Sequence, residues 1–266
     1  MLTEDPVFVA CLADVAQSTD RVRRRNALKT LENSIVPGVD SASAISLIHG
    51  ISDKVVSGKI LKLGLGGVLL DVISDDSTSE ICREKAALVL RECLRWAFKD
   101  GGKKVPSPPI DGREDVLKTI YVDFCRVLYG RMAPRIPIGD YGGGLVGRAP
   151  PSSRGPTEPS EEIRLVLVQT SSDILSYIDD SFNCGVEECG AVANSTSCDS
   201  SVGASSSSPP LTGPELVRAS SMLCRALASA GLADPYPDLA RASCAVLIRL
   251  AALFPEAVRG QAAQLL

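Results

Sequence analysis

Few residues of this sequence have the types and spacing that catalysis or metal binding requires. His49 is the single histidine, and a Ser-His-Asp or Cys-His nucleophile would need it beside its partners in a cleft. Cys184, Cys189 and Cys198 lie close together, but zinc sites need ligands at defined spacing, and these cysteines lie in a Ser-rich segment. We therefore expect no catalytic residues, no metal and no cofactor.

Two further patterns resemble catalytic motifs only in part. The glycine run from Tyr141 to Arg148 lacks the Gly-Lys-Ser/Thr ending of a phosphate-binding loop, and no strand is predicted before it. Glu161 and Glu162 are adjacent acids at a predicted helix start, where carboxylates interact favourably with the helix dipole. A flexible linker and a helix N-terminus explain these residues, so we predict a protein that is not an enzyme.

Composition narrows the class of protein further. The chain has 266 residues, a net charge of −4 and only 4% aromatic residues, which favours helices packed through small aliphatic side chains. The mild charge argues against a nucleic-acid partner. The most apolar run, residues 63–73, contains Asp71 and is too short to span a bilayer, so no membrane partner is expected. Nine cysteines without a CxxC pair suit the reducing cytoplasm.

Two segments differ from the rest in composition. Residues 132–159 are rich in Pro and Gly, and residues 183–212 are rich in Ser. Both have too few spaced apolar side chains to offset the entropy of ordering, so we predict flexible insertions there. The other segments have helical periodicity, with HEAT-like repeats predicted in 1–131, one repeat helix in 160–182 and further repeats in 213–266. The last helix stops abruptly, as it would in a truncated array.

One pattern repeats in four of the predicted helices. Each has an arginine near its start, and the residues 3, 4, 7 and 11 positions after that arginine are mostly apolar. This spacing places the apolar residues on one face of a helix, and we call them the arginine-led stripe. Another helix precedes each of them, at 6–17, 59–74, 113–131 and 214–230. The arginines are Arg24, Arg83, Arg164 and Arg241, and Asp76 and Asp234 each lie seven residues before one of them.

A helix, a turn with Asp and a helix that starts with Arg form the HEAT unit. Such hairpins must stack to bury their apolar faces. We therefore predict an all-α, HEAT/armadillo-like α-solenoid of about four hairpins, in which Asp and Arg form a ladder between successive turns.

A basic cluster at residues 21–25 is the main charge feature. It is either a solvated helix surface or part of a contact ridge. Because second helices line one side of a HEAT array, we name four candidate residues for binding an acidic protein partner: Arg21, Arg25, Lys85 and Arg91. Trp96 is either a binding anchor or a core residue.

Four stretches resemble the HEAT-repeat dynein axonemal assembly factor family. They are RVRRRNALKTLE (21–32), ISDDSTSEICREKAALVL (73–90), TEPSEEIRLVLVQ (157–169) and LASAGLADPYPDLARASCAVLIRLAALFPE (227–256), in the order found in the N-terminal part of that family. The resemblance implies a cytoplasmic scaffold that helps to preassemble outer and inner dynein arms for cilia. It would bind dynein intermediate or heavy chains alongside chaperones. The chain departs from the family in its short length, its two insertions and the missing Asp-Pro of its first turn.

Other scaffold classes are the alternatives. They are a generic HEAT adaptor, a phosphatase-type adaptor and a tubulin-binding array of the TOG type. TOG arrays contact tubulin through turns that bear Trp and Lys, whereas the turns here read Ser-Thr-Asp and Asp-Pro-Tyr-Pro. The turn sequences therefore argue against direct contact with tubulin.

Overall fold

The computed structural model describes residues 6–35, 48, 59–98, 113–132, 158–187 and 213–265. These residues are helical or lie in short turns between helices, and they contain no strand, which confirms the predicted all-α fold class. The helices are α1 (Pro6–Gln17), α2 (Arg21–Ile35), α4 (Lys59–Ser74), α5 (Glu80–Phe98), α6 (Arg113–Met132), α7 (Glu161–Glu187), α8 (Pro214–Ala226), η3 (Leu227–Gly231), α9 (Pro237–Leu253) and α10 (Pro255–Leu265).

Local signals set several helix starts. The Asp20 carboxylate accepts hydrogen bonds from the backbone N–H groups of Val22, at 2.8 Å, and Arg23, at 3.4 Å, and so caps α2. Proline occupies the first turn of α8 and of α9, where no N–H partner is needed. Within α4, Gly64 has φ 66° and ψ 172°, a backbone conformation that glycine adopts more readily than other residues. This non-helical conformation interrupts α4 at Gly64.

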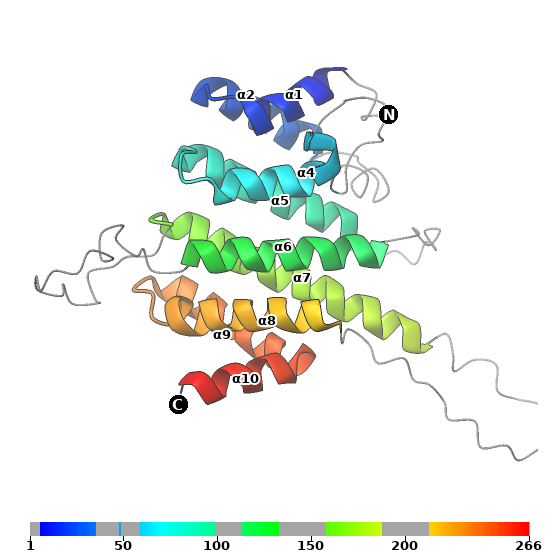
Figure 1. The fold of residues 1–266 in the computed structure, drawn as a ribbon, viewed down its shortest axis with the longest axis vertical. Coiled ribbons are helices and arrows are strands. Elements are labelled where there is room, and N and C mark those ends of the chain that lie inside the picture. The colour runs from blue at the N-terminus through cyan, green and yellow to red at the C-terminus, as the bar shows by residue number, and fades with distance from the viewer. Residues whose placement is uncertain are drawn as a thin grey trace, which may run out of the picture.

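The helices form two layers, and Figure 1 shows the successive helical pairs following one another along the long axis of the molecule. In the first layer α1, α4, α6, α8 and α10 contact one another in that order, and in the second layer α2, α5, α7 and α9 do the same. Each first-layer helix up to α8 also contacts the second-layer helix that follows it in the sequence. The result is a stack of helical hairpins, with α10 against α8 and α9 at its end.

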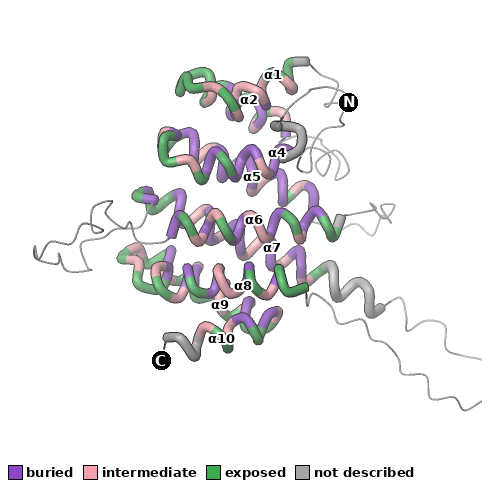
Figure 2. The backbone as a smooth tube through the Cα atoms, in the orientation of Figure 1, coloured by how far each residue is buried: buried purple, intermediate pink, exposed green. Residues whose placement is uncertain are grey.

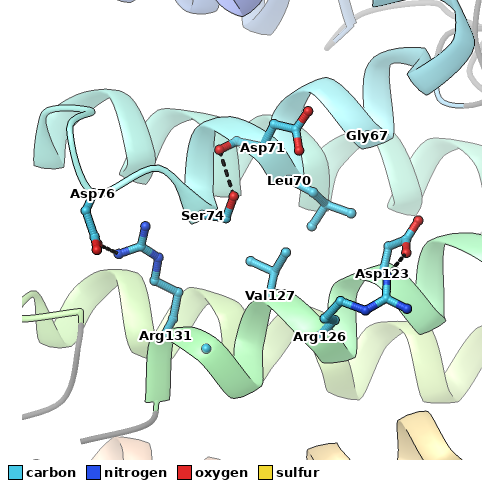
Figure 3. Close-up of a pocket in the computed structure, with 10 residues that line it drawn as sticks. Gly67, Leu70, Asp71, Ser74, Asp76, Asp123, Arg126, Val127 and Arg131 are labelled. Atoms are coloured by element: carbon cyan, nitrogen blue, oxygen red, sulfur yellow. Dashed lines mark hydrogen bonds and ion pairs between the residues drawn. The ribbon is translucent and has the colours of Figure 1, made fainter. Parts of the chain in front are cut away.

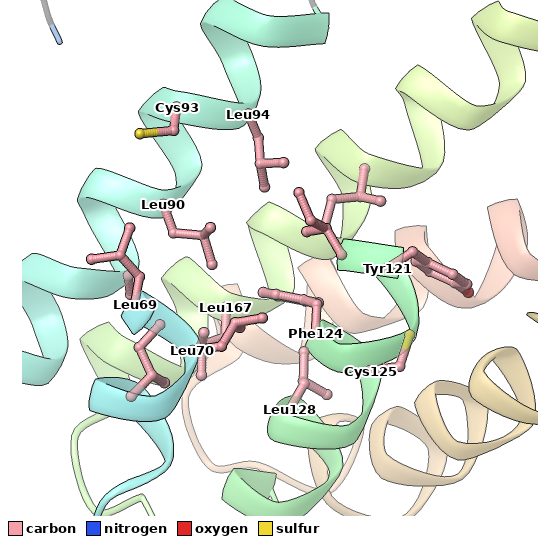
Figure 4. Close-up of a cluster of buried hydrophobic side chains, with 14 of the residues drawn as sticks. Leu69, Leu70, Leu90, Cys93, Leu94, Tyr121, Phe124, Cys125, Leu128 and Leu167 are labelled. Atoms are coloured by element: carbon pink, nitrogen blue, oxygen red, sulfur yellow. The ribbon is translucent and has the colours of Figure 1, made fainter. Parts of the chain in front are cut away.

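The apolar core is formed by residues of both layers, and Figure 2 shows buried segments in helices along the whole stack. In its middle, side chains from four helices meet, among them Leu70 of α4, Leu90 of α5, Phe124 of α6 and Leu167 of α7 (Figure 4). Trp96 is half-buried and packs against this core. The core is continuous from one hairpin to the next, so each hairpin depends on its neighbours for burial.

The arginine-led stripe is buried in three of the four helices in which the sequence predicts it. Its members at +3, +4, +7 and +11 are buried in α2, α5 and α7. In α9 the corresponding residues, Cys244, Ala245, Ile248 and Ala252, are exposed. There α9 buries Leu239, Ser243, Val246 and Leu250 instead. The prediction is wrong for α9 because, in the part of the chain described, no second-layer helix lies beyond it.

The predicted boundaries of the two insertions differ from the helix ends. Met132 belongs to α6, and Glu158, at the other end of the predicted segment 132–159, is fully buried. The repeat helix predicted at 160–182 is α7, which continues to Glu187 and so enters the segment 183–212. Amino-acid composition locates the middle of such a segment better than its ends. A few terminal residues that belong to a helix or the core do not change the average composition of the segment.

A tight contact between η3 and α9 gives the first testable prediction. A Cβ atom on Gly231 would lie 2.9 Å from Cβ of Ser243, which is fully buried, and closer still to its hydroxyl. Gly231→Ala should therefore lower the free energy of unfolding by about 1–3 kcal/mol. Gly130→Ala is the matched control, since nothing lies within 4 Å of the position that its Cβ would take and alanine favours the helix. Urea unfolding of both variants tests this, and equal stability would contradict it.

Candidate partner-binding surface

Arginines near the starts of α2, α5 and α7 each reach the turn of the next hairpin. In each case the guanidinium lies near a carboxylate that precedes the following second-layer helix. These contacts join hairpins that are distant in the sequence, as the predicted ladder would. The three pairs are Arg24–Asp75 at 3.9 Å, Arg83–Glu158 at 2.8 Å and Arg164–Asp234 at 2.9 Å.

Glu158 is the most connected member of this ladder. Both of its carboxylate oxygens accept hydrogen bonds from Arg83, at 2.8 and 3.0 Å, and Arg131 lies 4.0 Å away. Its backbone carbonyl accepts a hydrogen bond from Arg164 at 2.8 Å. The hydrogen bond from Arg83 to Glu158 raises the pKa of the Arg83 guanidinium. Sequence reasoning missed Glu158 because it lies in the Pro/Gly-rich segment, although its place six residues before Arg164 was a usable signal.

Asp76 has a different partner from the one that the ladder pattern suggests. It pairs at 2.6 Å with Arg131 of the first layer, and Asp75 is the acid that faces Arg24. Hydrogen bonds from Ser77 and Thr78 hold the pKa of Asp75 below its usual range. Asp75 therefore stabilises the folded protein when the pH is above the pKa that Asp75 has in the unfolded chain. This stabilisation is lost as the pH falls through the pKa that Asp75 has in the folded protein.

Arg241 does not join the ladder. Its guanidinium pairs at 2.6 Å with Asp238 one turn away in α9, and its side chain is 77% exposed. Asp234, in the turn before α9, forms an ion pair with Arg164 of the preceding hairpin. Among the described residues no turn of a following hairpin lies beside Arg241.

A pocket lies between α4 and α6, next to the ladder (Figure 3). Two ion pairs occupy its rim, Asp76–Arg131 and Asp123–Arg126, both at 2.6 Å. Leu70 and Val127 form part of its apolar wall. The described residues that line it include no cysteine or histidine. The pair Asp76–Arg131 links the turn before α5 to α6, whereas Asp123–Arg126 lies within α6.

Two of the four candidate partner-binding residues form ion pairs within the second layer. Lys85 of α5 pairs with Glu32 of α2 at 2.9 Å. Arg91 of α5 pairs with Asp173 of α7 at 2.8 Å and donates to the Gln169 side chain at 2.6 Å. Their charges are largely satisfied, because α5 lies between two helices that present acids to it.

The other two candidates are available to a partner. Arg21 and Arg25 are exposed, and neither guanidinium contacts an acid in the described ranges. They lie four residues apart, on one face of α2. Beyond them, between α5 and α7, a hollow is lined by Arg91, Arg95, Asp173, Tyr177 and Asp180, among others. Burial raises the pKa of Tyr177 to about 12, so its hydroxyl stays neutral.

We call the outer side of α2, α5 and α7 the second-layer face. It comprises the exposed Arg21 and Arg25 at one end and the hollow of mixed charge at the other. Exposed guanidiniums bind carboxylates through paired hydrogen bonds. The face is therefore suited to a protein segment whose acidic part meets α2.

Reactive groups are few in the described ranges. Four cysteines are buried in helices, and burial raises the pKa of the Cys93 thiol to about 12, so it holds its proton and is a poor nucleophile. Cys244 is exposed. No group of three or more His, Cys, Asp or Glu in these ranges is placed to hold a metal ion. None of the helices described is both long and apolar enough to cross a membrane.

Several sequence features lie outside the part that the structure describes. They are His49, the side chains of Cys184, Cys189 and Cys198, and the glycine run 141–148. Comparisons of the chain with models of protein families, with curated proteins and with solved structures found no match.

Proposed function

We propose that this chain is a HEAT-type α-solenoid that acts as a non-enzymatic scaffold for other proteins. The observation that supports this most is the ladder, in which arginines of three successive second-layer helices reach acids in the next turn. The same contact between one hairpin and the next therefore recurs along the stack, as is typical of solenoid proteins, in which each repeat contacts its neighbours. A stack of this kind presents a long surface that suits binding of an extended partner better than enclosure of a small substrate.

Within this class, we propose that the scaffold takes part in preassembly of axonemal dynein arms in the cytoplasm, by binding dynein intermediate or heavy chains together with chaperones. The support is the resemblance of four stretches to the dynein assembly factor family. Those stretches contain the ladder arginines Arg24, Arg83 and Arg164 and the acid Asp234. They also contain Arg21 and Arg25, the exposed pair on the second-layer face.

Charge reversal on α2 tests this proposal. The double variant Arg21→Glu, Arg25→Glu should bind dynein intermediate chain about tenfold more weakly, because exposed cations that meet an acidic partner become repulsive. The measurement is a pull-down with purified intermediate chain, followed by titration of the full chain. Arg218→Glu with Arg225→Glu is the matched control, since both arginines are exposed on α8 in the first layer.

The outcomes separate the alternatives. Equal binding by the two double variants would remove the second-layer face as the site. Absence of binding to intermediate and heavy chains, together with intact dynein arms in cells that lack the protein, would remove the dynein proposal. A shift of tubulin in a native gel would favour the tubulin-binding array in its place.

A further inference from the structure

Two exposed aliphatic side chains lie at the starts of neighbouring second-layer helices. Val22 of α2 is 66% exposed and Ile81 of α5 is 49% exposed. Each stands two residues before the ladder arginine of its own helix, so the stacking of hairpins brings the two to equivalent places. The Cys82 thiol donates to the backbone carbonyl of Arg21 at 3.8 Å, so the two helix starts are in contact.

The exposure of Ile81 is not an effect of the end of the stack. Its helix, α5, contacts α2 before it and α7 after it in the second layer, and α4 in the first. The isoleucine nevertheless keeps about half of its surface free. In α7 the equivalent residue is Glu162, an exposed carboxylate that accepts a hydrogen bond from the Ser160 hydroxyl at 3.0 Å. The second-layer face is therefore aliphatic at this position over α2 and α5 and polar over α7.

The charges around the two aliphatic side chains are divided between the helices. Val22 lies three residues before Arg25, on the same side of α2, and Arg21 immediately precedes it. Both arginines are exposed. On α5, Glu80 and Glu84 stand one residue before and three residues after the isoleucine. An acidic segment is therefore attracted to α2 and repelled from α5, which fixes where its carboxylates lie.

We propose that the α2–α5 part of the second-layer face binds an amphipathic helix of the partner protein. Two aliphatic side chains of that helix cover Val22 and Ile81, and its carboxylates pair with Arg21 and Arg25. The inference rests on the proposed binding role of the second-layer face and adds the chemistry of the segment bound there. Exposed apolar residues rimmed by polar ones are typical of such surfaces.

The spacing of the two helices sets the spacing in the partner. Packed helices lie about 8–10 Å apart. Seven residues of an α-helix span about 10.5 Å and make about two turns, so residues seven apart lie on one face. The bound helix therefore crosses α2 and α5 with its aliphatic side chains seven residues apart. Its acids lie around the side chain that covers Val22, and uncharged or basic residues lie around the other.

The probe is a designed helical peptide of about 16 residues with two leucines seven apart, glutamates around one leucine and lysines around the other. We expect saturable binding of the labelled peptide to the full chain by fluorescence anisotropy. Ile81→Ser in the chain should weaken binding about tenfold, because the isoleucine and the leucine that covers it both lose buried apolar area. Arg25→Gln should weaken binding about twofold to fivefold, as for an exposed ion pair.

Matched controls make the result specific. Ile248→Ser makes the same change at an isoleucine of α9 that is 68% exposed, and it should leave binding unchanged. Val22→Ser repeats the test on α2 and should weaken binding as Ile81→Ser does. A peptide with glutamine in place of its glutamates should bind more weakly, by about fivefold. Circular dichroism of each variant checks that the helices are intact.

The outcomes separate this inference from the proposed function. It is overturned if the peptide shows no saturable binding, if Ile81→Ser binds as the wild type does, or if Ile248→Ser loses as much. Dynein intermediate chain that depends on Arg21 and Arg25 but not on Ile81 would leave the scaffold role in place and remove only the aliphatic contact. Peptide binding that depends on Ile81, without binding of any dynein chain, would support the inference and remove the dynein assignment.

Discussion

Replacing Glu158 with alanine should lower the free energy of unfolding by about 3–5 kcal/mol, as expected when one partner of a buried ion pair is removed. Glu158 is 0% exposed, and its carboxylate accepts two hydrogen bonds from Arg83, whose side chain is also buried. Without that carboxylate, the Arg83 guanidinium stays in the interior and loses the acid that pairs with it directly. Arg131 loses the same acid at 4.0 Å and keeps only Asp76.

Chemical denaturation of Glu158→Ala and Glu158→Gln measures this effect. The glutamine variant keeps the shape and one hydrogen-bond acceptor, so it should lose less than the alanine variant. Asp238→Ala is the control, because it removes an acid from an exposed pair with Arg241 and should cost no more than about 1 kcal/mol. A loss for Glu158→Ala as small as that for Asp238→Ala would mean that the ladder does not hold the hairpins together.

Replacing Tyr121 with alanine should cost a similar amount, about 3–5 kcal/mol, by loss of packing. Tyr121 of α6 is fully buried, and its ring stacks on Phe254, between α9 and α10, with centroids 6.0 Å apart. Its hydroxyl shares a hydrogen bond of 2.8 Å with Ser220 of α8, which is also fully buried. One side chain of α6 therefore contacts both α8 and the turn between α9 and α10.

The Tyr121→Phe variant separates packing from hydrogen bonding. It keeps the ring and leaves the Ser220 hydroxyl without this partner, so we expect a loss of about 1–2 kcal/mol. Val22→Ala, at an exposed position, should change stability by less than about 0.5 kcal/mol. Equal losses for Tyr121→Phe and Tyr121→Ala would show that ring packing contributes little at this junction. Thermal and urea unfolding monitored by circular dichroism provide the comparison.

The helices could be predicted from the sequence because their signals are local. Those expected at 6–17 and 59–74 occur at those residues, and the one expected at 113–131 differs by a single residue. Apolar spacing, caps and prolines act within one or two turns of chain, so they can be read without knowledge of the neighbours. The ends of the two insertions were harder to place, because Glu158 owes its burial to residues far away in the sequence.

The candidate site was predicted in part. The arginines at 24, 83 and 164 were identified from their common frame, and Asp234 from its place in a turn. Which acid meets which arginine was not accessible, as Asp76 shows by pairing with Arg131 in the first layer. The sequence also did not reveal that Lys85 and Arg91 are paired with acids of neighbouring helices.

The sequence by itself therefore determined the all-helical class, the position of the helices and the residues that lead each stripe, because these depend on periodicity along one stretch of chain. The tertiary structure decided which charges are neutralised and which apolar faces are covered. Lys85 and Glu32 are 53 residues apart, and Arg91 and Asp173 are 82 apart, so their pairing exists only once the helices stack. For the same reason one stripe pattern is buried in α7 and exposed in α9, since burial depends on the neighbour and not on the residue.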